Sequence, residues 1–279
     1  MTPGDSVDWL RVNRANWDER AVVHASGELY DLAGFRAGRS TLRPFELAEI
    51  GDVTGRSLVH LQCHLGQDTL SWARQGAEVT GLDFSAQALG IARGLAAEAG
   101  LEDRARFVEA DVYEAGKVLD ERRFDIVYTG PGALVWLPDL DRWAAVAASL
   151  VADGGFVYLA EYHPLTGMLG VDGRTLERDY FDRRPMVVDE GSGYAGRAAL
   201  ENRLSVQWHH TLGEIVTALA GAGLRIEFLH EHPAAHGPGL PALRRDAFAG
   251  CYTPLPGDPQ IPLVYSLRAT RSSTRDASG

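Results

Sequence analysis

Short apolar runs alternate with longer amphipathic segments along the chain from residue 57 onward. The apolar runs have the length and composition of buried strands. We place five of them at residues 57–63, 78–84, 106–112, 124–130 and 154–162. Strands that alternate with helices build a mostly parallel sheet with helices on both faces. The pattern therefore predicts an α/β fold of the doubly wound, Rossmann-like type.

The segments between the strands carry helical periodicity and helix-boundary residues. Ser85 precedes a run with apolar residues on one helical face and Gly100 follows it, which predicts a helix over 85–100. Residues 139–152 show the same pattern, with Trp143 on the apolar face. We also expect a helix over 211–221, strands over 224–232 and 261–269, and two N-terminal helices over 7–22 and 44–51.

These elements divide the chain into an N-terminal helical cap, residues 1–56, and a core, residues 57–271. Within the core, residues 163–208 mix polar and aromatic side chains with little periodicity. An irregular stretch of this length in a compact domain is usually a lid or a binding insertion. Residues 272–279 are polar, and we expect them to form a disordered tail.

Composition and charge exclude several classes of partner. Of the 279 residues, 45% are hydrophobic and 23% charged, as in ordinary globular proteins. The 38 acidic and 27 basic residues give a net charge of -11, which repels phosphate backbones and anionic lipid headgroups. The two cysteines cannot build a disulfide framework, and the first residues show no apolar signal-peptide core. We therefore expect a cytoplasmic protein with a small-molecule partner, and neither nucleic acid nor a membrane.

The most informative run is LVHLQCHLGQDTLSWARQGAEVTGLDFSAQAL, residues 58–89. A turn from a buried strand into a helix brings backbone N–H groups up to a ligand. Asp83 ends the next strand, where a carboxylate can accept hydrogen bonds from two ribose hydroxyls. Asp111 ends the third strand, where it can bind an adenine edge. These acids could instead only cap the helices that follow, but three strand ends at one sheet edge favour a nucleoside site.

A dinucleotide fold would show G-x-G-x-x-G after the first strand, and only Gly66 is present. The sequence instead resembles the class I S-adenosylmethionine-dependent methyltransferases, and specifically a bacterial branch of specialised metabolism. The resemblance spans about residues 13–269 and rests on the motifs HLQCHLGQDTL, VTGLDFS, FVEADVY and FDIVYTGPGALVWLPDL. It implies a seven-stranded sheet whose last strand runs antiparallel between its neighbours. His60, Gln62 and His64 depart from the family pattern, which has an acid and two glycines there.

The resemblance implies S-adenosyl-L-methionine as the cofactor and assigns residues to it by position. Asp83 would bind the ribose hydroxyls and Phe84 would pack on the adenine, while the loop after the first strand would line the methionine end. The implied cofactor-binding residues are Gln62, Cys63, Gly66, Gln67, Asp68, Asp83, Phe84, Asp111, Val112, Thr129 and Gly130. Apart from Asp83, each could equally contribute only its backbone.

Methyl transfer from a sulfonium needs in-line placement of the acceptor and removal of the acceptor's proton. Histidine is the usual base near neutral pH. His163 ends the fifth strand, and His209 and His210 precede the helix over 211–221; His210 is our preferred base. His24 and Tyr30, on the N-terminal segment, are weaker candidates. Each of these histidines could instead be a capping or core residue.

Aromatic residues concentrate in the N-terminal cap, in the turn after the fourth strand and in the insertion. In lids, such residues form walls for flat apolar substrates. We assign the acceptor site to Trp17, His24, Trp136, Tyr180 and Trp208. The chain shows neither H-E-x-x-H nor C-x-x-C, so we expect no metal site.

These observations together predict an S-adenosylmethionine-dependent methyltransferase that acts on a small molecule. The acceptor type that we favour is an aromatic or heterocyclic natural-product intermediate such as an indole or a phenol, with carbon, nitrogen and oxygen all open as the methylated atom. One alternative is a nicotinamide-dependent oxidoreductase, against which the missing glycines argue. The other is an S-adenosylmethionine-binding protein that transfers no methyl group. No pattern indicates an oligomeric state.

Overall fold

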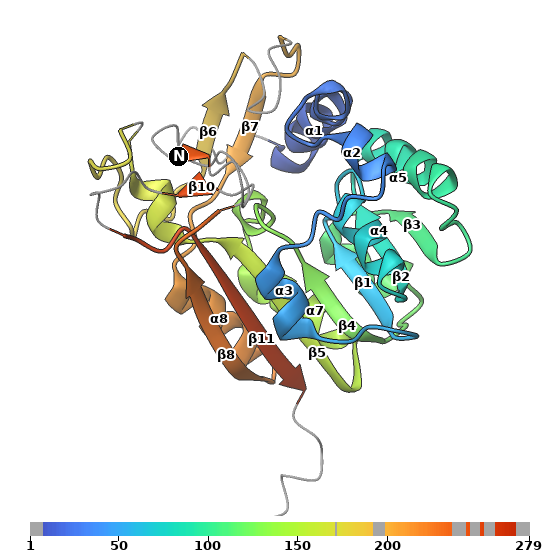
Figure 1. The fold of residues 1–279 in the computed structure, drawn as a ribbon. Helices are drawn as coiled ribbons and strands as arrows, with labels where there is room; N and C mark the ends of the chain where they lie inside the picture. The colour runs from blue at the N-terminus through green and yellow to red at the C-terminus, as the bar shows by residue number, and fades with distance from the viewer. Residues whose placement is uncertain are drawn as a thin grey trace, which may run out of the picture.

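Seven strands form one sheet in the order β3-β2-β1-β4-β5-β11-β8 (Figure 1). The computed structural model describes residues 8–170, 172–191, 199–235, 244–245, 252–253 and 260–271. The strands of the sheet are β1 (Ser57–Leu61), β2 (Glu78–Asp83), β3 (Ala105–Glu109), β4 (Phe124–Thr129), β5 (Val151–Tyr162), β8 (Leu224–His232) and β11 (Val264–Arg271). The first five pair in parallel, which confirms the predicted Rossmann-like α/β fold.

The last strand, β11, runs antiparallel between β5 and β8, as the resemblance implies. Leu267 lies opposite Leu159 of β5 and opposite Leu229 of β8. The strand begins at Val264, later than the predicted residue 261, because Pro262 has no N–H group to donate to a neighbouring strand.

Several strands end earlier than predicted, and the reason is local backbone geometry. β1 ends at Leu61 because Gln62 has a φ of 59°, which strand residues do not adopt. β3 ends at Glu109 because Asp111 already caps the short 3₁₀ helix η1 (Val112–Glu114). β5 ends as predicted but begins earlier, at Val151 and not at residue 154. Val151 pairs with Phe124 of β4 ahead of a register shift.

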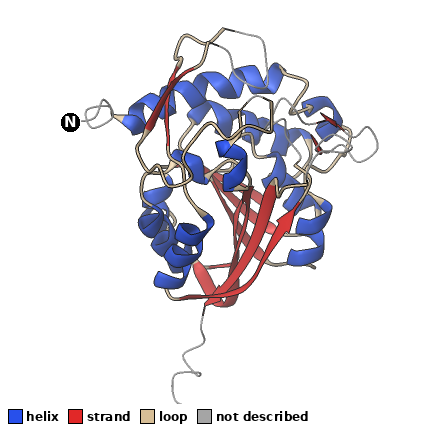
Figure 2. Cartoon of the chain, turned by 90° about the vertical axis from the view of Figure 1, so that its left-hand side faces the viewer, coloured by secondary structure: helices blue, strands red, loops and turns tan. Residues whose placement is uncertain are grey.

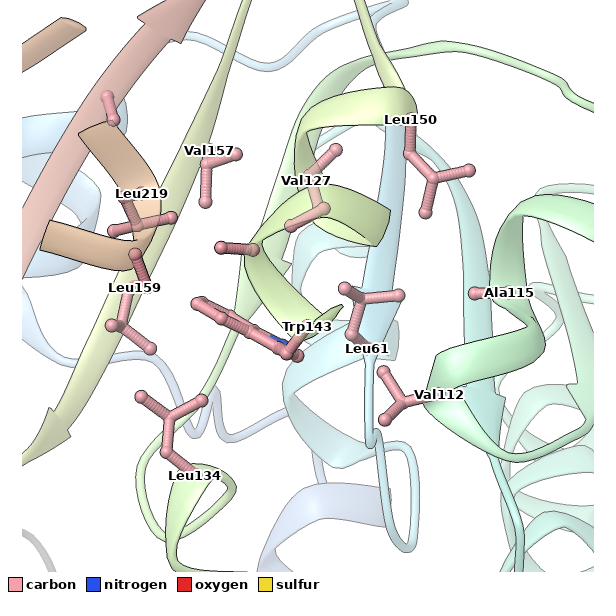
Figure 3. Close-up of a cluster of buried hydrophobic side chains, with 14 of the residues drawn as sticks. Leu61, Val112, Ala115, Val127, Leu134, Trp143, Leu150, Val157, Leu159 and Leu219 are labelled. Carbon is pink, nitrogen blue, oxygen red and sulfur yellow. The ribbon is translucent and has the colours of Figure 1, made fainter. Parts of the chain in front are cut away.

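Both faces of the sheet are apolar, and successive strand residues point to opposite faces. One face is covered by α7 (Leu140–Ser149) and α8 (Leu212–Gly221), and the other by α3 (Pro44–Ile50) and α4 (Gln67–Arg74). Figure 2 shows helices on both sides of the sheet. Figure 3 shows the cluster beneath α7, where the Trp143 ring lies among side chains that include Leu61, Val127 and Leu159.

The predicted helix starts are confirmed by their caps. Ser85 Oγ accepts a hydrogen bond from the backbone N–H of Ala88 at the start of α5 (Ala86–Glu98). Asp139 caps α7 in the same way, and Thr211 caps α8 with a capping box that includes Glu214. α7 ends at Ser149, before the predicted residue 152, because Val151 already belongs to β5.

The N-terminal cap holds three helices where two were predicted: α1 (Trp9–Ser26), α2 (Leu32–Arg36) and α3. α2 has five residues, too few to show a helical period. The predicted irregular insertion contains a 3₁₀ helix, η3 (Pro164–Met168), and an antiparallel hairpin of β6 (Met186–Asp189) and β7 (Leu204–Gln207). α1 packs beside β7 (Figure 1).

The remaining described elements are α6 (Ala115–Val118), η2 (Leu134–Trp136), β9 (Arg244–Arg245) and β10 (Tyr252–Thr253). The predicted tail, residues 272–279, lies outside the described residues. Among the residues that are described, no helix is both long and apolar enough to cross a bilayer.

Candidate active site

The loop after β1 has a left-handed backbone at every second residue. Gln62, His64 and Gly66 have φ values of 59°, 49° and 73°. Residues other than glycine rarely adopt such values, and they keep them where the surrounding structure demands it. The loop therefore has the shape of a glycine loop although it carries two polar side chains in place of glycines.

Gly66 is required by packing. A Cβ atom at this position would lie 2.8 Å from Cβ of Ala92 in α5 and 2.9 Å from the ring of Phe107 in β3. Both distances are shorter than atoms can approach without a shift of backbone or ring. This packing alone accounts for the glycine, so a direct contact of Gly66 with a cofactor stays a prediction.

Asp83 at the end of β2 holds the loop after β1 to the start of α5. Its carboxylate accepts hydrogen bonds from the backbone N–H groups of His64, at 2.8 Å, and Ser85, at 2.9 Å. The side chain is only 6% exposed, and burial raises the pKa of this carboxyl to about 6. Each oxygen keeps a further lone pair, so the carboxylate can still accept bonds from two hydroxyl groups.

Unsatisfied polar atoms lie at the same edge of the sheet. Among the described residues, Oε1 of Gln62 and Oγ1 of Thr129 are buried without a hydrogen-bond partner. Buried polar groups are nearly always paired in native proteins, so these two atoms are open to a ligand or to an ordered water molecule. Gly130 follows Thr129, and a Cβ there would lie 3.5 Å from Nε2 of His60 and from Oδ2 of Asp68. These atoms fit a ligand with both donor and acceptor groups, as the methionine end of S-adenosyl-L-methionine has.

Glu161 at the end of β5 fixes the loop after β4, although it is not among the site residues predicted from the sequence. Its carboxylate accepts backbone hydrogen bonds from Gly132, from Ala133 at 2.8 Å and from Leu134 at 2.9 Å. Burial raises the pKa of Glu161, although these N–H groups act to lower it. Ala133 in turn accepts a 3.0 Å hydrogen bond from Nε2 of Gln62. Glu161 thus positions both loops at this edge of the sheet.

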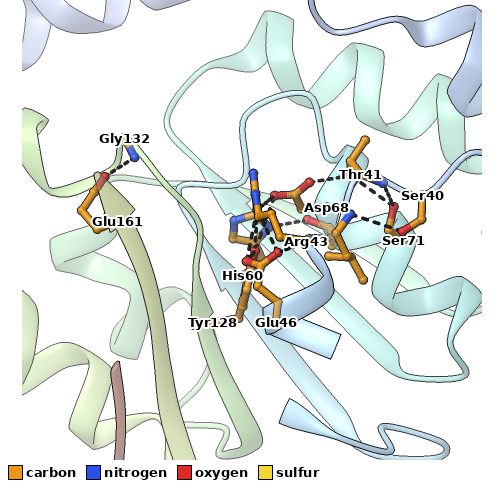
Figure 4. A network of polar contacts seen from close by, with 12 residues as sticks. Ser40, Thr41, Arg43, Glu46, His60, Asp68, Ser71, Tyr128, Gly132 and Glu161 are labelled. Carbon is orange, nitrogen blue, oxygen red and sulfur yellow. Dashed lines mark hydrogen bonds and ion pairs between the residues drawn. The ribbon is translucent and has the colours of Figure 1, made fainter. Parts of the chain in front are cut away.

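Asp68 lies in a charged cluster that joins α3 to α4 (Figure 4). Arg43 Nη1 lies 2.9 Å from Asp68 and 3.1 Å from Glu46, and the hydroxyl of Tyr128 donates to Glu46 at 2.7 Å. Burial raises the pKa of Glu46, whereas Arg43 holds the pKa of Asp68 down against burial. Because the pKa of Asp68 is held down, its carboxylate is the group of this cluster that can accept a hydrogen bond from a cationic ligand group such as an ammonium.

Five aromatic rings from four segments form what we call the aromatic cluster; its members are Trp17 and His24 of α1, Tyr30, His64 and Trp136. Nδ1 of His24 lies 3.0 Å from Nε2 of His64, within hydrogen-bond distance. Trp17 meets both His64 and Trp136 edge to face, with ring centroids 5.0 and 5.1 Å apart. Three predicted acceptor-site residues and the candidate base Tyr30 therefore lie together beside the loop after β1.

The other predicted cofactor residues lie at the same edge but are engaged in the fold. Cys63 is buried against Gly81, and burial raises the pKa of its thiol. Gln67 Nε2 donates to the carbonyl of Tyr30 at 2.7 Å.

The residues predicted to bind the adenine are also engaged in the fold. Asp111 accepts from the backbone of Tyr113 at 3.1 Å. Phe84 is half-buried and Val112 buried. Contacts of these residues with a cofactor stay predictions.

The three predicted histidine bases lie outside the aromatic cluster. Nε2 of His210 lies 2.8 Å from the carbonyl of Leu137, so this imidazole holds the start of α8 to the loop after β4. His163 accepts from the backbone of Leu165 at 3.2 Å and pairs with Glu231 at 2.9 Å. Nε2 of His209 is buried without a partner among the described residues. The assignment of a base to these residues stays a prediction.

The last two predicted acceptor-site residues also lie apart from the cluster. Tyr180 packs against His209, with ring centroids 5.4 Å apart. Trp208 meets Trp9 edge to face at 5.5 Å and donates its backbone N–H to Val135. Within the described part of the chain, no group of three or more His, Cys, Asp or Glu side chains is placed to hold a metal ion.

Comparison with known proteins gives the same class. Residues 59–155 match the family described as a methyltransferase domain. The chain is 30% identical over 135 residues to the ubiquinone biosynthesis O-methyltransferase of Serratia proteamaculans, covering 47% of this chain and 54% of the relative. It therefore spans about half the length of that curated relative.

Solved structures share the fold at low sequence identity. An S-adenosylmethionine-dependent methyltransferase from Mesorhizobium loti superposes with a TM-score of 0.53 at 20% identity, covering 82% of this chain and 96% of that one. The glycopeptide N-methyltransferase MtfA, crystallised with S-adenosyl-L-methionine, gives a TM-score of 0.55 at 18% identity over 82% of this chain and 92% of its own. Residues 59–155 therefore match a methyltransferase domain, and the chain has the fold of solved S-adenosylmethionine-dependent methyltransferases.

Proposed function

We propose that the protein transfers a methyl group from S-adenosyl-L-methionine to a small-molecule acceptor. The observation that carries the proposal is the joint placement of the glycine-type loop, the carboxylate of Asp83 and the unsatisfied atoms of Gln62 and Thr129 at one edge of the sheet. In open α/β sheets, ligands bind at the carboxyl ends of the strands where the strand order reverses, which here is between β1 and β4.

Different residues would bind the ribose, the adenine and the methionine end of the cofactor. Asp83 binds the ribose hydroxyls, and the adenine lies between Phe84 and the turn at Asp111 and Val112. Gln62, Thr129 and Gly130 face the methionine end, where the charged cluster around Asp68 binds the ammonium group. When bound, the cofactor supplies an electrophilic methyl group, so the chain has to orient the acceptor, exclude water and remove a proton.

The aromatic cluster supports an acceptor with a flat ring. The rings of Trp17 and Trp136 meet edge to face. Aromatic side chains of this kind bind flat rings through apolar contact with defined geometry. We propose an indole or phenol type of acceptor. One similar protein is named as an O-methyltransferase and another as an N-methyltransferase, so carbon, nitrogen and oxygen all stay open as the methylated atom. The net charge of -11 argues against a nucleic acid or an anionic membrane as the substrate.

Calorimetric titration with S-adenosylhomocysteine tests the cofactor, and radiolabelled S-adenosyl-L-methionine with a panel of indoles and phenols tests the transfer. At a hundred times its dissociation constant, the ligand should stabilise the chain by about 2.7 kcal/mol. Asp83→Ala should abolish that stabilisation. Binding of NADH in place of S-adenosylhomocysteine would instead indicate an oxidoreductase. Binding without transfer to any acceptor would indicate a cofactor-binding protein of another kind.

A further inference from the structure

His24 and His64 form a contact that joins α1 to the loop after β1. Nδ1 of His24 and Nε2 of His64 lie 3.0 Å apart, so one N–H group lies between two imidazoles. His24 is fully buried, whereas His64 is half-buried. The pair therefore has a buried member and a member that reaches the edge of the site.

The backbone of His64 is tied to the proposed cofactor site. Its N–H donates to Asp83 at 2.8 Å, the carboxylate that we propose binds the ribose. Its ring meets Trp17 at 5.0 Å and Tyr30 at 5.2 Å between centroids. His64 thus lies between the proposed cofactor carboxylate and the aromatic walls proposed for the acceptor.

We infer that His64 is the base that takes the proton from the acceptor and that His24 is a positioning residue that orients it. The inference rests on the proposed function. In the productive arrangement, Nε2–H of His64 donates to Nδ1 of His24, which leaves the lone pair on Nδ1 of His64 for the incoming proton. Many enzymes use this arrangement, in which a base takes the proton from the nucleophile and a third group orients the base.

The electrons and protons balance. The acceptor's lone pair forms the new bond to the methyl carbon as the carbon–sulfur bond breaks, and that bond's electron pair goes to sulfur. The acceptor's proton goes to Nδ1 of His64. The positive charge that leaves the sulfonium is then carried by the His64 imidazolium, whose Nε2–H stays bonded to neutral His24.

The surroundings of the pair keep both rings neutral at rest. Burial lowers the pKa of His24 to about 3, with Arg20 adding to the effect. Burial also holds the pKa of His64 well below its ordinary value, with His24 and Arg20 contributing. Arg20 on α1 is itself paired with Glu190 at 2.6 Å. Of the described residues, Asp83, on the backbone side of His64, and Tyr30, stacked on His24, are further ionisable groups that contact the pair.

The His64→Asn variant removes the base while keeping the loop, because asparagine tolerates a positive φ. We expect kcat to fall by about 10²–10⁴, the acidic limb of the pH profile to disappear, and the affinity for S-adenosylhomocysteine to stay unchanged. In His64→Gly, added imidazole should restore part of the rate. His230→Asn, on the outer strand β8 and 52% exposed, is the matched control and should turn over normally.

Substitutions of His24 separate orientation from structure. His24→Asn keeps an acceptor at the place of Nδ1 and should retain most of the rate, whereas His24→Leu should lose it. Nitrogen NMR of the imidazoles without cofactor gives a second readout. Nδ1 of His64 should be unprotonated in the wild type, and this preference should be lost in His24→Leu.

The outcomes are distinguishable. If the wild type neither binds S-adenosylhomocysteine nor transfers methyl groups, the proposed function fails. If the wild type methylates an acceptor and His64→Asn turns over at the same rate, only the role of His64 fails. A protonated Nδ1 in the wild-type His64 would also overturn the role of His64. A loss of turnover in His210→Ala with His64→Asn unaffected would overturn it too, and would assign the base to the turn before α8.

Discussion

Asn13 of α1 and Val206 of β7 exchange two hydrogen bonds. The side-chain amide of Asn13 donates to the carbonyl of Val206 at 2.8 Å, and the N–H of Val206 donates back to the Asn13 carbonyl oxygen at 2.7 Å. A side chain here takes the place of a neighbouring strand, since β7 has a partner strand only on its other edge. The same helix carries His24, so α1 connects the hairpin of the insertion to the loop after β1.

Asn13→Ala should therefore destabilise the protein by about 2–4 kcal/mol, because both backbone groups of Val206 stay buried and lose their partner. Chemical denaturation measures the loss, and hydrogen exchange at Val206 should accelerate well beyond that of the core strands. Arg14→Ala, on the exposed side of the same helix, is the control and should change stability little. Unaltered exchange at Val206 would show that β7 does not depend on Asn13.

Gly66 and Gly94 give a matched pair of glycine-to-alanine substitutions. At Gly66 the added Cβ would lie 2.8 Å from Ala92, and the φ of 73° disfavours alanine, so Gly66→Ala should cost about 2–4 kcal/mol. At Gly94, within α5, a Cβ would meet nothing within 4 Å. Gly94→Ala should stabilise by about 0.5–1 kcal/mol, because alanine favours a helix. Thermal denaturation of the two variants checks both signs, and similar stabilities would refute the packing argument.

The carboxyl of Asp83 should impose a pH dependence on stability. Its folded pKa of about 6 lies above the ordinary value of about 3.9, so the folded chain binds this proton more tightly than the unfolded chain does. Ionisation then destabilises the fold: the cost is absent below about pH 4, grows up to about pH 6 and is complete above it. The shift of about two units corresponds to about 3 kcal/mol.

Asp83→Asn removes this titration. The difference in unfolding free energy between variant and wild type should move in favour of the variant by about 3 kcal/mol between pH 4 and 7. Urea denaturation at a series of pH values measures it. The subtraction cancels the opposite trend from His24, whose lowered pKa makes the wild type more stable as the pH rises. Asp103→Asn, at an exposed site, should show no such movement, and a constant difference for Asp83→Asn would contradict the raised pKa.

Local signals explain which parts of the fold could be predicted from the sequence. The caps at Ser85, Asp139 and Thr211 bond to residues three positions away, so the sequence shows both partners together. The antiparallel direction of β11 was implied only by the resemblance. The hairpin of β6 and β7 was missed because each strand has four residues, and because α1, far away in sequence, supplies the contacts that hold it.

The site was harder to predict because its contacts join distant segments. The sequence marks Asp83 as a strand-end acid, but nothing near His64 indicates that it meets His24 of α1. A usable signal was present, since a histidine in place of a loop glycine accepts backbone strain and so points to a use for its ring. Glu161 also ends a strand, yet its partners are backbone N–H groups, which no sequence pattern displays.

Glu161→Gln tests how far the loop after β4 depends on one carboxylate. Three N–H groups of that loop, together with the N–H of Tyr162, point at the two oxygens of Glu161. A glutamine replaces one oxygen by an N–H donor, which then opposes these donors. The loop should shift and, through Ala133, release the side chain of Gln62. We expect a loss of about 1.5–3 kcal/mol in stability, as for hydrogen bonds to a charged group.

The shift of this loop should also reach the cofactor. If Gln62 and Thr129 face the methionine end, the dissociation constant for S-adenosylhomocysteine should rise by about tenfold in Glu161→Gln, equivalent to about 1.4 kcal/mol. Adenosine, which lacks the methionine end, should bind the variant and the wild type equally well in calorimetry. Glu114→Gln, on an exposed carboxylate paired with Arg142, serves as the control and should leave both affinities unchanged. An equal loss of affinity for adenosine would place the effect of Glu161 on the whole site and not on the methionine end.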